Sequence, residues 1–273
     1  MKKMPSRYPS LRAAIGSLAR SLILALAAAV VLVAGPLPSA QAAEGGAALD
    51  HFPASKLKDK AALQDGARTF VNYCMACHGA ALMRYNRLQD IGLSDIQIRN
   101  GLILDPAVKV GDTMKTAMRP EDAKVWFGAL PPDLSVITRA RSSGAGSGSD
   151  WLYTYLRSYY RDASRATGWN NAVFPNVGMP HALWHLQGSR GATIEEIKAD
   201  KDANGKVTGY TRNLIAFDTN GVRSEKKEAL HGGHGHESTH TTLGPAQGGT
   251  LSQPQFDETV ANLVAFLTYV SDP

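Results

Sequence analysis

The sequence predicts a mainly α-helical fold with two long helices near the ends of the chain. Apolar residues recur at three- and four-residue intervals from Asp59 to Tyr73 and again over residues 257–270, which is the pattern of amphipathic helices. A third observation concerns the end of the first helix, where both cysteines of the 273-residue chain lie in the string Cys74-Met75-Ala76-Cys77-His78. We expect the two helices to pack across each other and the first to present this string at its C-terminal end.

The cysteine string has the spacing at which haem is attached covalently to protein. Two thiols three positions apart can each form a thioether with one vinyl group of the porphyrin, and the adjacent imidazole can reach the iron from the same side. A thiol redox pair usually lies near a βαβ pattern, and a zinc site needs further thiol or histidine ligands at matched spacing. We therefore expect one covalent haem c, held by Cys74 and Cys77 with His78 as an iron ligand.

The first 42 residues have the layout of a secretory signal peptide. A basic region precedes an apolar run over residues 22–34, and a small-residue stretch ends at Ala42. The alternative is an uncleaved anchor, but the run is short of the ~20 residues that a membrane span needs. We expect cleavage after Ala42 and export, which in a bacterium means the periplasm, with the haem domain in residues 43–273.

Removal of residues 1–42 would change the net charge of the chain. The whole chain has 29 basic and 24 acidic side chains and a formal net charge of +5, whereas residues 43–273 carry 24 of each. The basic balance of the whole chain is therefore no argument for a nucleic-acid partner, and we expect none. With both cysteines committed to haem, no disulfide supports the fold.

A third helix is predicted after Arg119. Proline suits the first position of a helix and acids suit its first turn, so Arg119-Pro120-Glu121-Asp122 indicates a helix start, and Gly128 indicates its end. Pro131 and Pro132 then force an extended segment. Residues 142–149 are rich in glycine and serine and predict a linker.

A fourth helix is predicted from Trp151 to about Tyr160, with Asp150 as its N-cap. Its face with Trp151, Tyr155 and Tyr159 packs against the core, a haem, or both. For the C-terminal helix, Ser252 is a candidate cap, and the acids at its start lie in its first turn.

Residues 187–249 differ in character and predict an inserted lobe. Short β-prone runs flank Asp202-Ala203-Asn204-Gly205, which predicts a β-hairpin over residues 195–217 with an Asn-Gly turn. The tract from His231 to His240 holds four of the eight histidines and raises a metal-binding hypothesis. We favour a solvated, disordered loop there, because no rigid scaffold surrounds these residues.

An electron-transfer haem usually takes a second axial ligand, and a methionine sulfur favours ferrous iron. Met179 has the best physical case, because Pro180 holds it out of the α-region and Gly178 lets the backbone turn close to a flat cofactor. Its alternative role is a thioether that fills the core. The other candidate ligands left open are Met114, Met118 and, in a bis-histidine arrangement, His181.

Five strings occur in order along the chain: Cys74–His78, Gly128–Ser135, Trp151–Arg157, Gly178–Pro180 and Val264–Tyr269. From about residue 50 to the end, the chain thereby resembles the cytochrome c1 family of the cytochrome bc1 complex. The Pro-Pro-Asp-Leu-Ser string within Gly128–Ser135 is the most specific motif after the haem string. The resemblance implies a class I cytochrome c-like helical fold around one covalent haem, with an inserted β-hairpin and loop lobe at about residues 187–249.

The resemblance also implies a function. The family takes single electrons from the Rieske iron-sulfur subunit and passes them to a soluble cytochrome c, beside cytochrome b in a quinol-oxidising complex. The chain alone would make or break no bonds, and the site would face the periplasm at the bacterial inner membrane. The alternatives are a free soluble periplasmic electron carrier and a haem enzyme with an exchangeable sixth ligand.

Roles for individual residues follow from the same resemblance. Met179 would be the distal ligand opposite the proximal His78, and Pro131 and Pro132 would line the haem edge. The candidates for pairing with the haem propionates are Lys124, Arg139 and Arg141. A charged hydrogen bond to a buried carboxylate is worth up to ~3 kcal/mol. Lys124 departs from the family pattern, which has an arginine just ahead of the Gly-Ala-Leu step, and it is weaker for bidentate pairing.

Family members continue past the last helix into a C-terminal membrane anchor, whereas this sequence stops at Pro273. No apolar run after residue 43 approaches the ~18 residues that a span needs. Either the sequence is truncated or the anchor has been lost, and we favour truncation because no replacement module follows the last helix.

Overall fold

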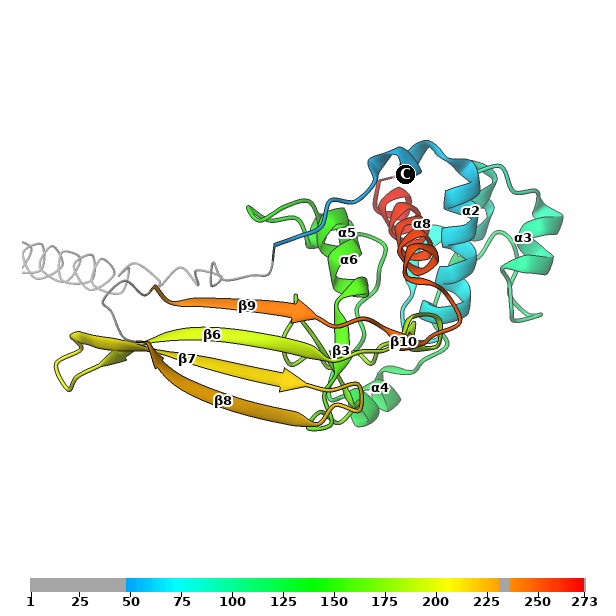
Figure 1. Cartoon of the computed structure of the whole chain (residues 1–273). Coiled ribbons are helices and arrows are strands. Elements are labelled where there is room, and N and C mark those ends of the chain that lie inside the picture. Colours follow the sequence, from blue (N-terminus) through cyan, green and yellow to red (C-terminus); the bar gives the residue numbers. More distant parts are fainter. Residues whose placement is uncertain (1–47, 231–235, 273) are drawn as a thin grey trace, which may run out of the picture. The chain divides into compact units, whose positions relative to one another are not determined.

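The computed structural model describes residues 48–230 and 236–272, so the predicted signal peptide lies outside the described residues. Figure 1 shows helices packed around α8 and a four-stranded sheet formed by β6, β7, β8 and β9. The helices are η1 (Ala54–Lys58), α2 (Lys60–Thr69), the π-helical η2 (Phe70–Cys74), η3 (Tyr85–Gln89), α3 (Asp95–Gly101), α4 (Pro120–Phe127), α5 (Ile137–Ala140), α6 (Gly148–Arg157), α7 (Trp184–Gln187) and α8 (Gln253–Ser271). The strands are β1 (Ala80–Arg84), β2 (Thr113–Met114), β3 (Tyr159–Arg161), β4 (Trp169–Asn171), β5 (Gly188–Ser189), β6 (Ala192–Lys201), β7 (Val207–Phe217), β8 (Arg223–Leu230), β9 (Ser238–Leu243) and β10 (Gln247–Gly248).

The first predicted helix is confirmed as α2 followed by η2. The Asp59 carboxylate accepts hydrogen bonds from the amides of Ala61 and Ala62, which would otherwise lack partners at the helix start. At the other end, the amide of Met75 donates to the carbonyl of Phe70, so the last turn widens into a π-turn. This turn delivers Cys74 to the start of the cysteine string.

The C-terminal helix, α8, begins earlier than the sequence predicted. Ser252 caps it in a capping box with Gln255, so Asp257 and Glu258 lie in its second turn, and the expectation of acids in the first turn was wrong. These two acids pair with other elements instead, Asp257 with Arg157 and Glu258 with Lys56. Through these ion pairs the two acids hold α8 against α6 and η1, and they do not lie at the N-terminal end of the helix dipole.

Helices α2 and α8 cross in close contact, as predicted (Figure 1). The crossing point is Gly66, where a Cβ atom would lie 2.0 Å from the carbonyl oxygen of Asn262 and 2.8 Å from Cβ of Phe266. Phe70 and Phe266 pack beside this point with ring centroids 5.7 Å apart, and both are fully buried. Only a residue without a side chain allows the two backbones to approach this closely.

The two middle helices are present, with two corrections. The helix predicted from Trp151 to about Tyr160 ends at Arg157, and Tyr159 lies in strand β3, so the prediction of Tyr159 on the helix face was wrong. Helix α4 starts with Pro120 and ends at Gly128, whose φ of 70° is the left-handed conformation of a helix C-cap. Helix α6 is capped by Ser147, and Asp150 closes the capping box from the third helical position, so the prediction of Asp150 as N-cap was wrong. The predicted linker over residues 142–149 is instead a tight turn that leads directly into α6.

The predicted hairpin is present as β6 and β7, which pair from Ala192↔Phe217 to Lys201↔Val207. Gly205 occupies the turn with φ of 81°. The sheet is larger than predicted, with the order β8-β7-β6-β9 and all pairs antiparallel. Helix makes up 35% and strand 25% of the described residues, so the fold is mixed rather than mainly α.

Strand β8 was missed because its residues are mostly charged and show no apolar alternation. Backbone pairing with β7 stabilises it, together with ion pairs such as those that Arg212 of β7 makes with Glu195 of β6 and Glu228 of β8. Strand β9 includes His240, so part of the histidine tract is strand rather than the predicted loop. The part of that tract over residues 231–235 lies outside the described residues.

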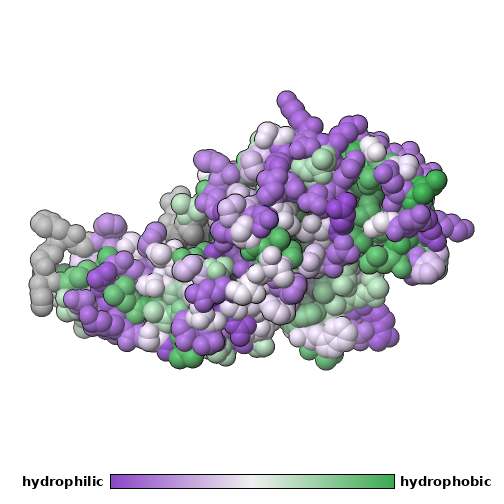
Figure 2. Space-filling view, turned by 45° about the vertical axis from the view of Figure 1, so that its right-hand side comes forward, coloured by the Kyte–Doolittle hydropathy of each residue, from purple (hydrophilic) through white to green (hydrophobic). Residues whose placement is uncertain are grey.

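Apolar surface on the face shown in Figure 2 occurs as patches among hydrophilic side chains. Within the described residues, no helix is both long enough and apolar enough to cross a membrane.

The crossing of α2 and α8 predicts a steep cost for any side chain at position 66. We expect Gly66→Ala to lower the free energy of unfolding by about 2 kcal/mol, because the added methyl group must displace the α8 backbone. Urea denaturation of the haem-loaded protein measures this. Gly101→Ala is the matched control, since nothing lies within 4 Å of its Cβ position, and it should be neutral or stabilising. Equal stabilities for the two variants would contradict the close crossing.

Candidate functional site

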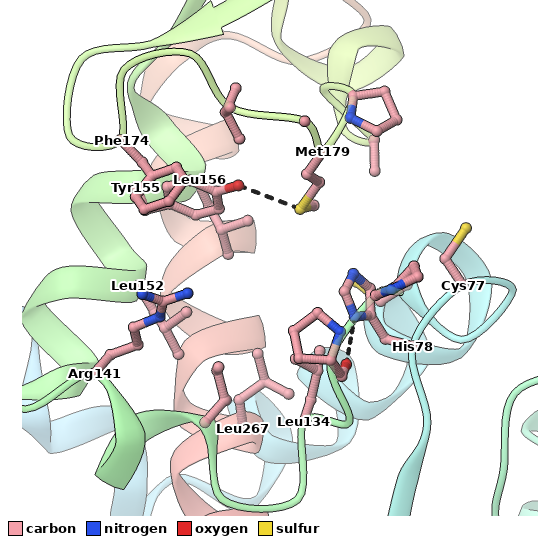
Figure 3. Close-up of a pocket in the computed structure, with 18 of the residues that line it drawn as sticks. Cys77, His78, Leu134, Arg141, Leu152, Tyr155, Leu156, Phe174, Met179 and Leu267 are labelled. Atoms are coloured by element: carbon pink, nitrogen blue, oxygen red, sulfur yellow. Dashed lines mark hydrogen bonds between the residues drawn. The ribbon is translucent and has the colours of Figure 1, made fainter. Parts of the chain in front are cut away.

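A cavity of about 310 Å³ lies where the cysteine string, the segment after α4, helix α6, the Met179 loop and α8 meet. Figure 3 shows its lining, which is mostly apolar. The residues that line it are Tyr73, Cys74, Cys77, His78, Phe127, Ala129, Leu130, Pro131, Pro132, Leu134, Ile137, Arg141, Trp151, Leu152, Tyr155, Leu156, Phe174, Val177, Gly178, Met179, Pro180, Ala182, Leu263 and Leu267.

The imidazole of His78 is oriented by one short hydrogen bond. Its Nδ1–H donates to the carbonyl oxygen of Pro132 at 2.7 Å (Figure 3). Because a carbonyl can only accept, this bond places the hydrogen on Nδ1 and leaves Nε2 with a free lone pair. Burial lowers the pKa of His78, against the opposing effects of the Pro132 bond and the Asp133 charge, so the ring is neutral at pH 7. A neutral imidazole with Nε2 available is the form that binds iron.

The Pro-Pro-Asp-Leu-Ser string runs beside the residues that follow His78. The amide of Leu134 donates to the Gly79 carbonyl at 2.7 Å, and the amide of Ala81 donates to the Asp133 carboxylate at 2.8 Å. The amide of Leu82 donates to the hydroxyl oxygen of Ser135 at 3.0 Å. A Cβ atom at Gly79 would lie 2.9 Å from the Asp133 carboxylate, so glycine permits this approach. Together these bonds fix the chain after the cysteine string.

Both cysteines are thiols in this structure, and both line the cavity. Burial, with a smaller effect from Cys77, raises the pKa of Cys74 to about 12, and burial raises the pKa of Cys77 as well. The loop between them is held from outside, because the hydroxyl of Thr116 donates to the Ala76 carbonyl at 2.9 Å. This bond thus holds the backbone between the two cysteines beside the cavity.

The thioether of Met179 reaches the same cavity from a different chain segment. The hydroxyl of Tyr155 lies 3.4 Å from the Met179 sulfur (Figure 3) and 2.7 Å from the hydroxyl of Tyr159. Burial raises the pKa of Tyr155, against the Tyr159 bond and the Arg141 charge, and raises that of Tyr159 well above its ordinary value. Both phenols therefore keep their hydrogen at neutral pH.

The other candidate ligands do not line the cavity. Met114 is fully buried in β2, and Met118 is only partly buried. His181 is buried against the ring of Tyr159, with centroids 4.7 Å apart, and its Nε2 pairs with the amide oxygen of Gln187 at 2.8 Å. Burial lowers the pKa of His181 to about 3, so this ring is a neutral packing group. Among the sequence-based candidates for the sixth ligand, only Met179 lines the cavity.

Residues 51–190 of the chain match the family model of the Cytochrome C1 family. The chain belongs to this family. Membership implies an electron-transfer subunit with haem c in the context of a bc1 complex.

Three relatives illustrate the family. The chain is 40% identical over 225 residues to a protein named ammonia monooxygenase gamma subunit from Nitrosomonas europaea. The aligned residues make up 82% of this chain and 74% of the relative. It is 37% identical over 239 residues to cytochrome c1 of Allochromatium vinosum, covering 86% and 80%. It is 31% identical over 251 residues to cytochrome b/c1 of Bradyrhizobium diazoefficiens, covering 74% and 35%.

The residues of this cytochrome c1 family member fit the haem that the family implies. An apolar cavity carries two thiols and an imidazole from one segment, and a thioether from another. Pro131 and Pro132 are both part of the lining. Within residues 48–230 and 236–272, no group of three or more histidine, cysteine or acidic side chains could hold a separate metal ion.

Of the three predicted propionate partners, the structure brings only Arg141 to the cavity. Its guanidinium lies 4.5 Å from the ring centroid of Trp151, across the cavity from His78 (Figure 3). Arg139 pairs with Asp272 at the end of α8, and Lys124 is exposed on α4. Neither of these two lines the cavity.

Sequence reasoning missed the asparagines that shape the segment leading to Met179. Asn171 is fully buried, and its side chain accepts from the amides of Val173 and Phe174 and donates to the Tyr155 carbonyl. Asn170 accepts from the amide of Asn176, a residue with φ of 62°. The signal that could have found them is the Asn-Asn pair just before a turn-rich stretch, where such side chains bond to nearby backbone.

The Asp133 contacts predict a pH-dependent stability. Burial acts to raise the pKa of Asp133, but hydrogen bonds from Ser135 and the Ala81 amide hold it below its ordinary value. A carboxyl whose pKa is lower in the folded state stabilises that state above the unfolded pKa of about 4, and the contribution is lost as pH falls through the folded pKa.

We therefore expect Asp133→Ala to lower the free energy of unfolding by about 1 kcal/mol at pH 7, with the gap to the native protein closing below about pH 4. Urea denaturation at pH 7, 5 and 3 measures this. Asp133→Asn keeps an acceptor oxygen without titrating, so it should fall between the two. A gap that stays constant down to pH 3 would contradict the role of the carboxylate.

Proposed function

We propose that the chain is the haem subunit of a quinol-oxidising bc1 complex. It takes single electrons from a Rieske iron-sulfur protein and passes them to a soluble cytochrome c, at the periplasmic face of a bacterial inner membrane. The observation that carries the proposal is that the imidazole of His78 and the thioether of Met179 reach one apolar cavity, which Cys74 and Cys77 also line. In this proposal the cysteines hold the haem, His78 is the proximal ligand and Met179 is the distal ligand.

Bound haem supplies a one-electron change at its iron, and the chain's residues determine the conditions under which that occurs. Pro132 holds His78 in the tautomer with a free Nε2, which makes the ring a stronger and better-oriented ligand. Met179 would ligate the iron from a different segment of the cavity lining, and a thioether ligand favours the ferrous state. With His78 and Met179 both holding the iron, the site would have no open position for a substrate. This favours electron transfer over haem catalysis.

Arg141 adds a cation to a lining that is mostly apolar. Within the described part of the chain it makes no ion pair with a carboxylate. Its guanidinium is held in place by stacking on Trp151. We propose that it binds a haem propionate, because a buried carboxylate needs a charged donor and Arg141 is the one predicted partner within reach of the cavity.

A surface for redox partners adjoins the cavity. Leu130 both lines the cavity and is 54% exposed, and Val125 and Trp126 of α4 are 82% and 65% exposed. Apolar side chains beside the opening of a site suit a small interface that forms and dissociates quickly. We propose that the two electron partners approach here in turn.

The name of the Nitrosomonas relative suggests a second candidate, electron supply to an ammonia-oxidising enzyme. The same haem site serves either pathway, so the difference lies in the partner and not in the cavity. The name cytochrome b/c1 of the Bradyrhizobium relative favours the bc1 assignment.

The ligand assignment predicts the effect of replacing Met179. We expect the native protein to show a low-spin visible spectrum with the weak sulfur-to-iron band, and Met179→Leu to lose that band and lower the midpoint potential. Met114→Leu is the matched control, because Met114 is buried away from the cavity, and it should keep the band. A high-spin native spectrum with ready binding of exogenous ligands would instead indicate a haem enzyme.

The partner assignment predicts what the chain is isolated with. A tagged chain, expressed in its own host and extracted from membranes with mild detergent, should be recovered with b-type haem absorption and the electron paramagnetic resonance signal of a Rieske cluster. Recovery from the periplasmic fraction without either signal would favour a free soluble carrier. Recovery with ammonia-oxidising activity would favour the second candidate.

A further inference from the structure

The two phenols beside Met179 make more contacts than their hydrogens can serve. The hydroxyl of Tyr155 lies 3.4 Å from the Met179 sulfur, the hydroxyl of Tyr159 lies 3.4 Å from the Met179 carbonyl oxygen, and the two hydroxyls are 2.7 Å apart. Each hydroxyl has one hydrogen, so two hydrogens serve three contacts. If Tyr155 donates to the sulfur, Tyr159 must donate to Tyr155. If Tyr159 donates to the carbonyl, Tyr155 must donate to Tyr159 and the sulfur receives nothing.

The distances favour the first arrangement. An O–H···O bond normally spans 2.5–3.0 Å, so 3.4 Å from Tyr159 to the Met179 carbonyl is too long for a good bond. The same 3.4 Å to a sulfur atom is an ordinary contact, because sulfur is the larger acceptor. The 2.7 Å between the hydroxyls is the usual length for such a pair.

Both rings are held so that these contacts persist. The ring of Tyr155 stacks on Trp151, with centroids 4.7 Å apart. The ring of Tyr159 stacks on His181 at the same separation, and the Tyr159 carbonyl accepts from Nε of Arg190 at 2.9 Å. Tyr159 is 1% exposed. Water therefore does not compete for the Tyr159 hydroxyl.

We propose that Tyr159 is a positioning residue that directs the hydroxyl hydrogen of Tyr155 onto the thioether of Met179. The proposal rests on the proposed role of Met179 as an iron ligand. A phenol that accepts a hydrogen bond is a stronger donor, so Tyr159 strengthens the bond from Tyr155 to the sulfur. A sulfur that accepts this bond gives less electron density to ferric iron, so the pair raises the midpoint potential.

Three variants test this, each measured by redox titration and by the sulfur-to-iron band. Tyr155→Phe removes the donor to sulfur and should lower the midpoint potential while the band persists. Tyr159→Phe removes only the supporting donor and should lower it by a smaller amount. The double variant should match Tyr155→Phe alone, because Tyr159 acts through Tyr155. Tyr153→Phe, on the same helix but outside the cavity lining, is the matched control and should leave the potential unchanged.

The sign of the Tyr159→Phe shift decides between the two arrangements. In the second arrangement, loss of Tyr159 would free Tyr155 to donate to the sulfur, and the potential would rise. A rise, or no shift in either single variant while the band is present, would overturn the proposal and leave the ligand assignment intact. Absence of the band in the native protein would overturn both.

Discussion

The hydrogen bond from His78 Nδ1 to the Pro132 carbonyl joins two segments that are 54 residues apart in sequence. It sets the tautomer of the imidazole, and it aligns the Pro-Pro-Asp-Leu-Ser string with the chain after the cysteines. The bonds from Leu134 and to Asp133 continue the same alignment. The imidazole–carbonyl contact therefore orients the iron-binding side chain and belongs to the set of bonds that shapes one wall of the cavity.

The opposite wall of the cavity consists mainly of apolar side chains. Leu152 and Leu156 of α6 and Leu267 of α8 turn apolar side chains toward the cavity (Figure 3). Leu263 of α8 also lines it. A flat apolar cofactor would complete this part of the core, as a large side chain does elsewhere. The polar groups are few and directed: the Tyr155 hydroxyl toward the Met179 sulfur, and the Arg141 guanidinium on the far side. The leucines of α6 and α8 that line the haem site are thus also residues of the hydrophobic core.

The features that the sequence predicted well are those with local chemistry. The cysteine string, Gly128 at a helix end and the Asn204-Gly205 turn each need only their neighbours to be recognised. The cap of α6 was misassigned because Ser147 and Asp150 are reciprocal partners in one capping box, and either residue type suits the N-cap.

Features that depend on distant partners were harder to predict. Strand β8 is charged along most of its length and is a strand only because β7 offers a partner. Arg139 and Arg141 look alike in sequence, yet only Arg141 reaches the cavity, since residues two positions apart near a short helix point to different sides.

We propose above all that the Met179 sulfur ligates the haem iron opposite His78. Proton NMR of the ferrous protein tests it most directly, because a methyl group on an axial sulfur lies in the porphyrin ring current. We predict one methionine methyl resonance shifted far upfield of all others and assignable to Met179; a spectrum without such a resonance, or one assigned to another methionine, would contradict the account.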